Sequence, residues 1–375
     1  MKSYVLSAAV AAILAGTFLA CGKNSKEIII GGVAPLTGEA ATFGASTKNG
    51  FDLAIEEWNA KGGINGKMIK LAFADDKGDP AEGATVFTKL IQQDKAVACV
   101  GPVMSKVALA SAPICQAAGI PMMTSAATNA KVTLVGDYIF RACFIDDFQG
   151  VVGAKFAFND LKTKKAACIF DVGNDYTKGL SEFFKKQYTE MGGQVVAFEG
   201  HATGTTDFKA QLTKIIAAGP EVLYVSDYYN DVALIAKQAR ELGFKGPMVG
   251  GDGWDSPKLV EIGGAAVEGG FFTNHYAADD TTPVVQEFVK KYTAKFNAAP
   301  DALAVLGYDG CYLLFDAIKR AGKLDGPSIK AALAATDMQV VSGKVKFDEN
   351  RNPLKSAAIV EVKNGKFVYR TTVNP

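Results

Sequence analysis

The stretch EIIIGGVAP, residues 27–35, opens the folded part of the chain and indicates its class. Three consecutive isoleucines cannot all face one side of an amphipathic helix, so the run is typical of a strand buried on both faces. Residues 45–60 follow with Phe51, Ile55 and Trp58 at helical spacing, and the glycines of the next segment, KGGING, end that helix. A buried strand followed by an amphipathic helix is the first half of a β-α-β unit.

The alternation of strand and helix continues along most of the chain. Strands are expected at KMIKLAFADD, AVACVGP and GIPMMTS, and after residue 146 at KAACIFDV, QVVAFEG, EVLYVSD and GPMVGGD, with helices between them. This rhythm predicts an α/β fold with two doubly wound parallel sheets, each covered by helices on both faces. A chain of 375 residues is also too long for one core to be the default.

The end of the chain breaks this rhythm. A second lobe that is complete before residue 275 cannot easily accommodate three more helices, so we expect the chain to recross between lobes. The elements expected there are helices at 283–297, 302–321 and 327–335, then strands near 340–347, 356–362 and 367–372.

Composition excludes several classes of function. Lys and Arg total 40 against 39 for Asp and Glu, so no global positive field favours nucleic acid. His201 and His275 stand alone, which excludes an H-E-x-x-H zinc site, and no G-x-S-x-G or G-x-G-x-x-G motif occurs. We therefore expect no catalytic residues, no metal and no cofactor. The sequence leaves open whether any disulfide forms among five cysteines, Cys99, Cys115, Cys143, Cys168 and Cys311.

Residues 1–21, MKSYVLSAAVAAILAGTFLAC, have the layout of a secretory signal peptide. Lys2 precedes an apolar run that is short for a membrane span. The end of the run, FLAC, resembles a bacterial lipoprotein box, so Cys21 is the expected lipidation site and residues 22–26 the tether. The alternative is ordinary signal cleavage at a small residue, which leaves Cys21 without a role.

Polar and aromatic residues follow the expected strands, at the sheet edge where open α/β folds bind ligands. GPVMS delivers Ser105 to the start of a helix, and MMTSAATNAK, residues 122–131, offers bare backbone with Ala126 and the hydroxyl of Thr128. The corresponding edge of the second sheet offers mainly aromatic side chains and an acid: Tyr176, Asp227, Tyr228, Tyr229, Asp252 and Trp254. Hydroxyls and amides on one side and an acid on the other suit a small zwitterion.

These segments carry a family resemblance. VAPLTGEAATFG, NAKGGINGKMIKLAFADDKGDP, GIPMMTSAATN, FDVGNDYTKGL, GGDGWDSP and GYDGCYLLFDAI together resemble the periplasmic leucine/isoleucine/valine-binding proteins, the type I receptors of branched-chain amino-acid ABC importers. The resemblance spans about residues 27–373 and implies two lobes joined by three hinge crossings. We expect an N-terminal lobe of residues 27–146 plus 275–338 and a C-terminal lobe of residues 147–274 plus 339–375.

The resemblance also implies roles for single residues. Ser105, Ala126 and Thr128 match the positions that hold the ligand carboxylate, and Thr128 also contacts the ammonium. Asp252 matches the acid that binds the ammonium, where family members often have Glu. Tyr176 and Tyr228 match the aromatic residues that close over the ligand, with Tyr229 as the alternative to Tyr228. Two further aromatics complete the expected site: Phe43 of the first lobe and Trp254, which either lines or caps the cleft.

The expected function is an exported, monomeric solute-binding protein of the periplasm or cell envelope. It would bind an amino acid, most simply Leu, Ile or Val, by hinge closure and deliver it to ABC permease subunits in the inner membrane. Two alternatives stay open: the same fold binding urea, short amides or aromatic acids, and an extracytoplasmic sensory module. An enzyme is disfavoured because histidine is scarce and nucleophile motifs are absent.

Overall fold

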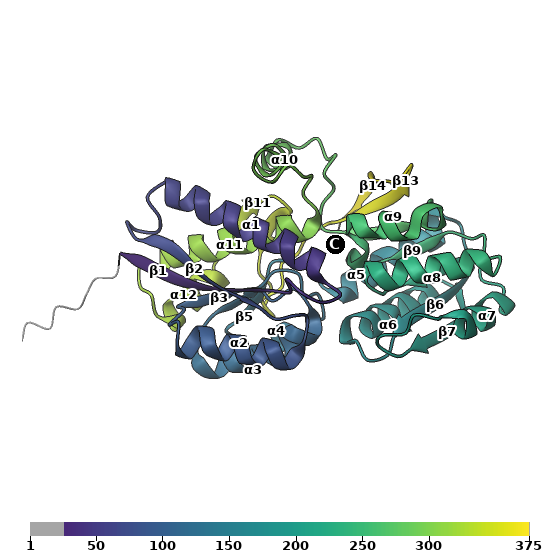
Figure 1. The fold of residues 1–375 in the computed structure, drawn as a ribbon, viewed down its shortest axis with the longest axis horizontal. Coiled ribbons are helices and arrows are strands. Elements are labelled where there is room, and N and C mark those ends of the chain that lie inside the picture. The colour runs from purple at the N-terminus through teal and green to yellow at the C-terminus, as the bar shows by residue number, and fades with distance from the viewer. Residues whose placement is uncertain (1–25, 375) are drawn as a thin grey trace, which may run out of the picture.

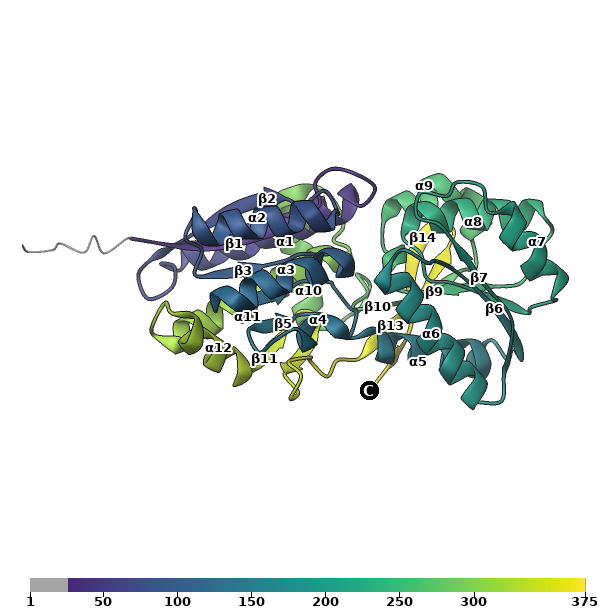
Figure 2. The same cartoon turned by 90° about the horizontal axis from the view of Figure 1, so that it is seen from below.

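The computed structural model describes residues 26–374, which form two lobes side by side (Figures 1 and 2). The first lobe is built on a five-stranded sheet in the order β2-β1-β3-β4-β5, with every pair parallel. Ile28 and Ile30 of the opening strand are buried, as expected for a strand covered on both faces. The strands are β1 (Glu27–Ala34), β2 (Met68–Asp75), β3 (Ala98–Val100), β4 (Met122–Thr124) and β5 (Ile139–Arg141).

Helices cover both faces of this first sheet. One face carries α1 against α11, a pair drawn from opposite ends of the chain, and the other carries α2 against α3. Asp79 caps α2 by accepting from Ala81 N and Glu82 N, which fixes where that helix begins. The helices of this lobe are α1 (Ala41–Ala60), α2 (Pro80–Gln92), α3 (Ser105–Ala118), α4 (Lys131–Leu134), α10 (Pro283–Phe296), α11 (Ala302–Ala321) and α12 (Gly326–Ala334).

The second lobe has a seven-stranded sheet in the order β14-β13-β10-β9-β8-β6-β7. The chain's last two strands add antiparallel pairs to an otherwise parallel sheet. The strands are β6 (Lys165–Asp171), β7 (Gln194–His201), β8 (Val222–Val225), β9 (Met248–Gly250), β10 (Phe271–Asn274), β13 (Ala357–Lys363) and β14 (Lys366–Val373). The helices are α5 (Asp146–Lys155), η1 (Phe156–Asp160), α6 (Asp175–Glu190), α7 (Lys209–Ala217), α8 (Tyr229–Glu241), η2 (Asp252–Trp254), α9 (Pro257–Gly263) and η3 (Gly264–Val267).

This architecture confirms the predicted fold class. The chain passes between the lobes three times, at residues 142–145, 275–282 and 347–356, which we call the first, second and third crossings. The expected signal peptide, Cys21 and residues 22–25 of the expected tether lie outside the described residues. Within residues 26–374, none of the helices is both long and apolar enough to cross a membrane.

The last predicted boundary, between residues 338 and 339, is wrong. It falls inside a hairpin of β11 (Asp337–Val340) and β12 (Gly343–Lys346) that belongs to the first lobe. The hairpin stays there because Asp309 of α11 accepts hydrogen bonds from Val341 N and Ser342 N, each at 2.9 Å. The chain enters the second sheet only at Ala357.

A buried lysine joins the crossings. Lys355 of the third crossing donates to the carbonyl of Ala142 in the first crossing at 2.9 Å and to the hydroxyl of Ser342. Burial lowers the pKa of the Lys355 ammonium, and the nearby Asp309 carboxylate opposes that shift. Lys355 therefore ties the first and third crossings together from a buried position.

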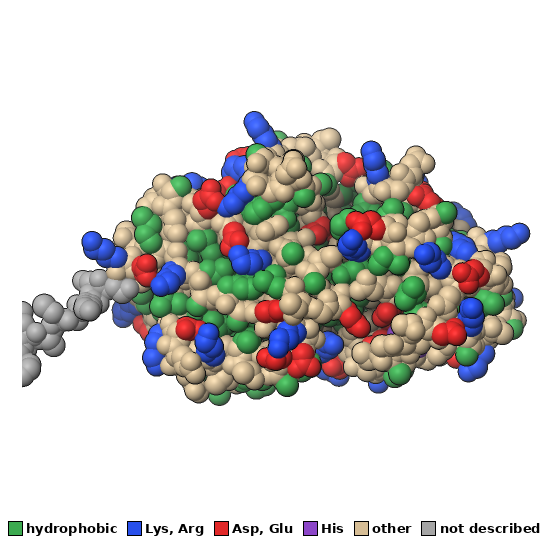
Figure 3. Space-filling view, viewed as in Figure 1, with side chains coloured by type: hydrophobic (Ala, Val, Ile, Leu, Met, Phe, Trp, Pro, Cys, Tyr) green, Lys and Arg blue, Asp and Glu red, His purple; other side chains and the backbone are tan. Residues whose placement is uncertain are grey.

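The surface charges and the cysteines give little indication of function. On the face in Figure 3, basic and acidic side chains are interspersed, in keeping with the balanced charge of the sequence. The five cysteines after residue 26 are all buried and free of disulfides. Cys therefore acts here as a small core residue.

Candidate ligand-binding site

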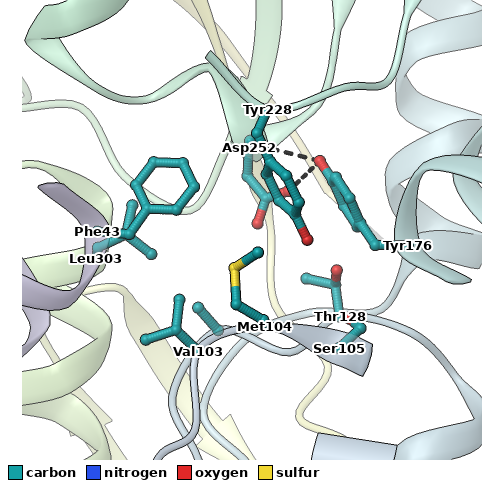
Figure 4. A pocket seen from close by; sticks show the side chains of 11 residues that line it. Phe43, Val103, Met104, Ser105, Thr128, Tyr176, Tyr228, Asp252 and Leu303 are labelled. Carbon is teal, nitrogen blue, oxygen red and sulfur yellow. Dashed lines mark hydrogen bonds between the residues drawn. The ribbon is translucent and has the colours of Figure 1, made fainter. Parts of the chain in front are cut away.

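A narrow cavity lies between the lobes, at the carboxyl ends of their parallel strands (Figure 4). Both lobes contribute side chains to it, as expected for the switch point of open α/β sheets. Its lining residues are Phe43, Val103, Met104, Ser105, Ala126, Thr128, Tyr176, Tyr228, Asp252, Gly253 and Leu303.

The first lobe supplies hydroxyls and backbone. Ser105 is the first residue of α3, so it stands at a helix N-terminus, where free amides and the helix dipole favour an anion. Its Oγ accepts from the backbone amide of Asn129 at 3.2 Å, which links α3 to the segment after β4. Ala126 and Thr128 lie on that segment and both line the cavity. The bare backbone of residues 125–128 thus forms one wall of the site.

Arg141 anchors this wall from behind. Its side chain is fully buried; Nη1 donates to the carbonyl of Ala127 at 2.8 Å and Nη2 to that of Asn129 at 2.9 Å. Burial lowers the pKa of the guanidinium, although nearby acids oppose the shift. The fork of N–H groups turns the carbonyls of the segment inward, away from the cavity. Nothing in the sequence indicated a role for Arg141, because a single Arg at the end of a strand forms no distinctive pattern.

The second lobe supplies aromatic rings. Tyr176 and Tyr228 stack with ring centroids 5.2 Å apart and planes 11° apart. Tyr176 Oη donates to Asp252 Oδ1 at 2.8 Å and accepts from Gly253 N at 3.1 Å. Burial raises the pKa of Tyr176 well above its usual range, and Asp252 adds to the shift. The phenol is therefore a neutral donor to the carboxylate (Figure 4).

Asp252 is fixed from several directions. Its backbone amide donates to Gln149 Oε1 at 2.7 Å, and the same oxygen accepts from Thr273 Oγ1 at 2.7 Å. Its Oδ2 lies 2.9 Å from His275 Nε2, at the start of the second crossing. The carboxylate is therefore positioned by α5, β10 and the hinge as well as by Tyr176. None of these partners could be predicted from local sequence.

The lobes touch around the cavity. Phe43 of α1 meets the rings of Tyr228 and Tyr229 edge-on, with centroids 5.9 and 5.0 Å away. Tyr229 Oη donates to the carbonyl of Glu39 at 2.7 Å, and Asn129 Nδ2 donates to that of Asp175 at 2.9 Å. Tyr228 lines the cavity, while Tyr229 contributes a bond between the lobes.

Seven of the eight expected binding residues line the cavity, and Trp254 does not. The Trp254 side chain is fully buried in the second lobe; its Nε1 donates to the carbonyl of Val225 at 2.9 Å, and its ring packs on Phe272. The short η2 turn places Asp252 toward the cavity and the indole, two residues later, toward the core. The proposed cleft role of Trp254 is therefore wrong.

The apolar part of the lining was missed. It comprises Val103, Met104 and Leu303, which lie beside Phe43 in Figure 4. Leu303 reaches the cavity from the start of α11, after the second crossing has returned the chain to the first lobe. The only sequence signal for Val103 and Met104 was their position just before Ser105.

Two acids lie beside the site: Asp255 is buried and joins the lobes, and Asp301 is half-buried at the start of α11. Asp255 Oδ2 accepts from Ala302 N at 2.7 Å and from Asn274 Nδ2 at 2.9 Å. Asp301, the N-cap of α11, accepts from Ala304 N and from Ser46 Oγ. Burial raises the pKa of Asp255 to about 6 and that of Asp301 to about 7, with the neighbouring charges adding to both shifts.

This acid pair predicts a pH dependence of stability. A raised pKa means that the folded chain binds more protons than the unfolded chain, so the free energy of unfolding should fall as pH rises from about 4 to about 7. In Asp301→Asn, which keeps a good helix cap, the fall between pH 5 and pH 8 should shrink by about 2 kcal/mol in urea unfolding. Asp207→Asn, at an exposed position, is the control. An equal fall in both variants contradicts the assignment.

No group of three or more His, Cys, Asp or Glu side chains between residues 26 and 374 is placed to hold a metal ion. The site therefore offers hydrogen bonds, one carboxylate, aromatic rings and an apolar wall.

Comparisons with known proteins agree on the family. Residues 27–366 match the family model described as periplasmic binding protein. The Leu/Ile/Val-binding protein homolog 2 of Brucella abortus is 33% identical over 356 residues, which cover 93% of this chain and 94% of the relative.

Solved structures show the same relationship. The leucine-binding protein LivK of Thermotoga maritima has a TM-score of 0.89 at 39% identity, covering 93% of this chain and 99% of that one. LivJ of Streptococcus pneumoniae in complex with isoleucine has a TM-score of 0.88 at 34% identity, covering 93% and 100%. A solute-binding protein of R. palustris in complex with benzoate has a TM-score of 0.85 at 26% identity, covering 93% and 97%. The chain belongs to the periplasmic binding proteins, in the family of the Leu/Ile/Val-binding proteins.

Proposed function

We propose that the chain binds a branched-chain amino acid between its lobes and delivers it to the permease of an ABC importer. One observation carries the proposal: the cavity presents anion-binding groups on one wall, a carboxylate on the other, and an apolar wall beside them. Each part of an aliphatic amino acid then has a matching surface.

The ligand carboxylate belongs on the first lobe. The N-terminus of α3, the hydroxyls of Ser105 and Thr128 and the backbone near Ala126 all lie there. A hydroxyl can donate to a carboxylate, and helix-terminal amides have no partner within the helix. This wall carries no basic side chain, so dipoles rather than a full charge would balance the anion.

The ligand ammonium belongs at Asp252. The charge-assisted bond strengthens when closure removes water, because the local dielectric falls. The aliphatic side chain then lies against Phe43, Val103, Met104 and Leu303. Selectivity among Leu, Ile and Val depends on the volume of this apolar part, where one methylene changes binding by about 1–3 kcal/mol.

Aromatic acids are the main alternative, since a structural neighbour holds benzoate. Such a ligand has no ammonium, and it would leave the Asp252 carboxylate buried without a counter-charge, which is costly. Urea and short amides share this difficulty, and a purely sensory role stays an alternative. The buried acid therefore favours an amino acid.

Isothermal titration tests the proposal. Protein unfolded and refolded to remove bound ligand should bind Leu, Ile or Val with a Kd of about 1 μM or tighter, and benzoate and urea much more weakly. Binding of benzoate with no binding of any amino acid would contradict the proposal and favour an aromatic acid as the ligand.

Delivery to a permease requires export. We propose that residues 1–20 are removed and that Cys21, then the first residue of the mature chain, anchors a monomer in the cell envelope. Mass measurement of the mature N-terminus decides between a lipidated Cys21 and ordinary signal cleavage.

Trp254→Phe separates packing from binding. We expect the free energy of unfolding to fall by about 1–2 kcal/mol, because the Val225 carbonyl loses its buried donor. The affinity for leucine should stay within about twofold, since the indole does not line the cavity. Urea unfolding measures the stability and titration measures the affinity. A large loss of affinity at unchanged stability would show that Trp254 contributes to ligand binding.

A further inference from the structure

His275 holds the Asp252 carboxylate from the side opposite the cavity. Its Nε2 lies 2.9 Å from Asp252 Oδ2, and its side chain is 1% exposed. The imidazole stacks on Phe144 of the first crossing, with ring centroids 3.7 Å apart. His275 is itself the first residue of the second crossing. This one side chain therefore connects the expected ammonium site to two of the three hinge crossings.

The surroundings of His275 keep it neutral. Burial lowers the pKa of the imidazole, and the Lys355 ammonium acts in the same direction, while Asp252 opposes them. Asp279 and Asp280 are the other charged groups on the second crossing, and Asp280 lines the same hinge cavity as His275. Burial therefore decides the charge state.

A neutral imidazole has one N–H, and the contacts show where it lies. Nε2 faces a carboxylate oxygen, whereas Nδ1 has no hydrogen-bond partner among residues 26–374. A carboxylate can only accept, so the proton belongs on Nε2. The imidazole then donates to Asp252 and leaves the Nδ1 lone pair toward the hinge.

Both side-chain donors to Asp252 are thus uncharged: the phenol of Tyr176 and the imidazole of His275. They fix the two oxygens without cancelling the negative charge. A lysine, an arginine or a protonated histidine in the same place would neutralise the carboxylate and take the position of a cationic ligand group. The negative charge therefore remains for the ligand.

We propose that His275 is a positioning residue for ammonium recognition, a neutral Nε2–H donor that orients Asp252 while leaving its charge to the ligand. The inference rests on the proposed function, because it needs a ligand with an ammonium group. It adds a specificity element that lies on the hinge rather than in the cavity.

Discrimination between leucine and 4-methylpentanoate, which is leucine without its amino group, tests this role. The Kd for 4-methylpentanoate divided by the Kd for leucine measures how much the ammonium group contributes to binding. In His275→Phe this ratio should fall by at least about tenfold, because Asp252 loses one of its two donors, while 4-methylpentanoate binds as before. His275→Gln, which keeps an amide donor, should retain most of the ratio. His201→Gln is the matched control: it disturbs the other buried His–Asp pair, with Asp227, away from the cavity lining.

Nitrogen NMR of the ligand-free protein provides a readout independent of binding. The chain has two histidines, so His275→Gln identifies the His275 signals by their loss. We expect His275 as the Nε2–H tautomer, neutral at pH 7, with a pKa below that of an ordinary histidine because it is buried. His201 should be charged: burial lowers its pKa, but the hydrogen bond and charge of Asp227, with the Ala202 carbonyl and the charge of Asp171, together outweigh burial and raise the pKa to about 9.

The outcomes separate the inference from the proposed function. No binding of any amino acid by the wild type overturns the function. Leucine binding with the same ratio in His275→Phe as in the wild type overturns the inference alone, as does an Nδ1–H tautomer or a His275 that titrates near pH 6.5. If His275→Phe does not fold, the Kd ratio of His275→Gln and the tautomer of His275 in the wild type still test the inference.

Discussion

Replacing Asp252 by Asn should weaken leucine binding by about 100-fold, because the ammonium loses a charge-assisted bond in a water-poor site. The side chain keeps its shape and one carbonyl oxygen, so the backbone of η2 and its bond to Gln149 remain. Affinity for 4-methylpentanoate should change little or improve, since the buried charge is gone. Titration of both compounds with refolded protein measures the effect.

Two further variants make this result specific. Asp252→Glu, which keeps the carboxylate on a side chain one methylene longer, should keep the preference for leucine over 4-methylpentanoate. Glu261→Gln, an acid of the same lobe on α9, should behave as the wild type. If Asp252→Asn binds leucine within about threefold of the wild type, the ammonium lies elsewhere and the amino-acid orientation proposed above is reversed or wrong.

Replacing Arg141 by Leu should lower the free energy of unfolding by about 3–5 kcal/mol. The carbonyls of Ala127 and Asn129 lose buried donors, and no water replaces the guanidinium without opening the core. Because these carbonyls belong to the segment that carries Thr128, leucine affinity should also fall, by at least about tenfold. Urea unfolding gives the first quantity and titration of the folded variant gives the second.

Arg240 offers the matched control. Its guanidinium also donates to backbone carbonyls, those of Phe244 and Gly246 at 2.9 and 2.8 Å, but in the second lobe and away from the cavity. Arg240→Leu should therefore lower stability without changing leucine affinity. Equal losses of affinity in the two variants would show that the effect of Arg141 is general destabilisation rather than support of the binding segment.

Local patterns in the sequence predicted the elements well. The helix expected to begin at Ser105 begins there, because a small polar residue at a helix start is a local signal. The helix expected at 302–321 matches α11 residue for residue. The positions of Ser105, Thr128 and Asp252 at one cavity follow from the same logic, because the ends of parallel strands share an edge.

Contacts between distant segments could not be predicted in this way. Arg141 and His275 act on residues that only the folded chain brings near, and a single polar residue has no periodicity to reveal its partner. Trp254 shows the converse error: its place next to Asp252 suggested a shared role, but a short turn sends neighbouring side chains to opposite sides. The β11–β12 hairpin was divided between lobes for the same reason, since its anchor, Asp309, lies on α11.

The pairing of α1 with α11 and the placement of β13 and β14 in the second sheet have a consequence for the order in which the protein can be made. Neither lobe is a continuous piece of the chain. As synthesis proceeds from the N-terminus, the first lobe cannot be completed before α11, which begins at residue 302, has been made. The second lobe cannot be completed before β13, which begins at residue 357, has been made. The first core therefore stays incomplete until α11 has been made, and the second until the last twentieth of the polypeptide has been made. Neither lobe can therefore be obtained by cutting the chain at a single point, so the protein cannot be trimmed to one working half.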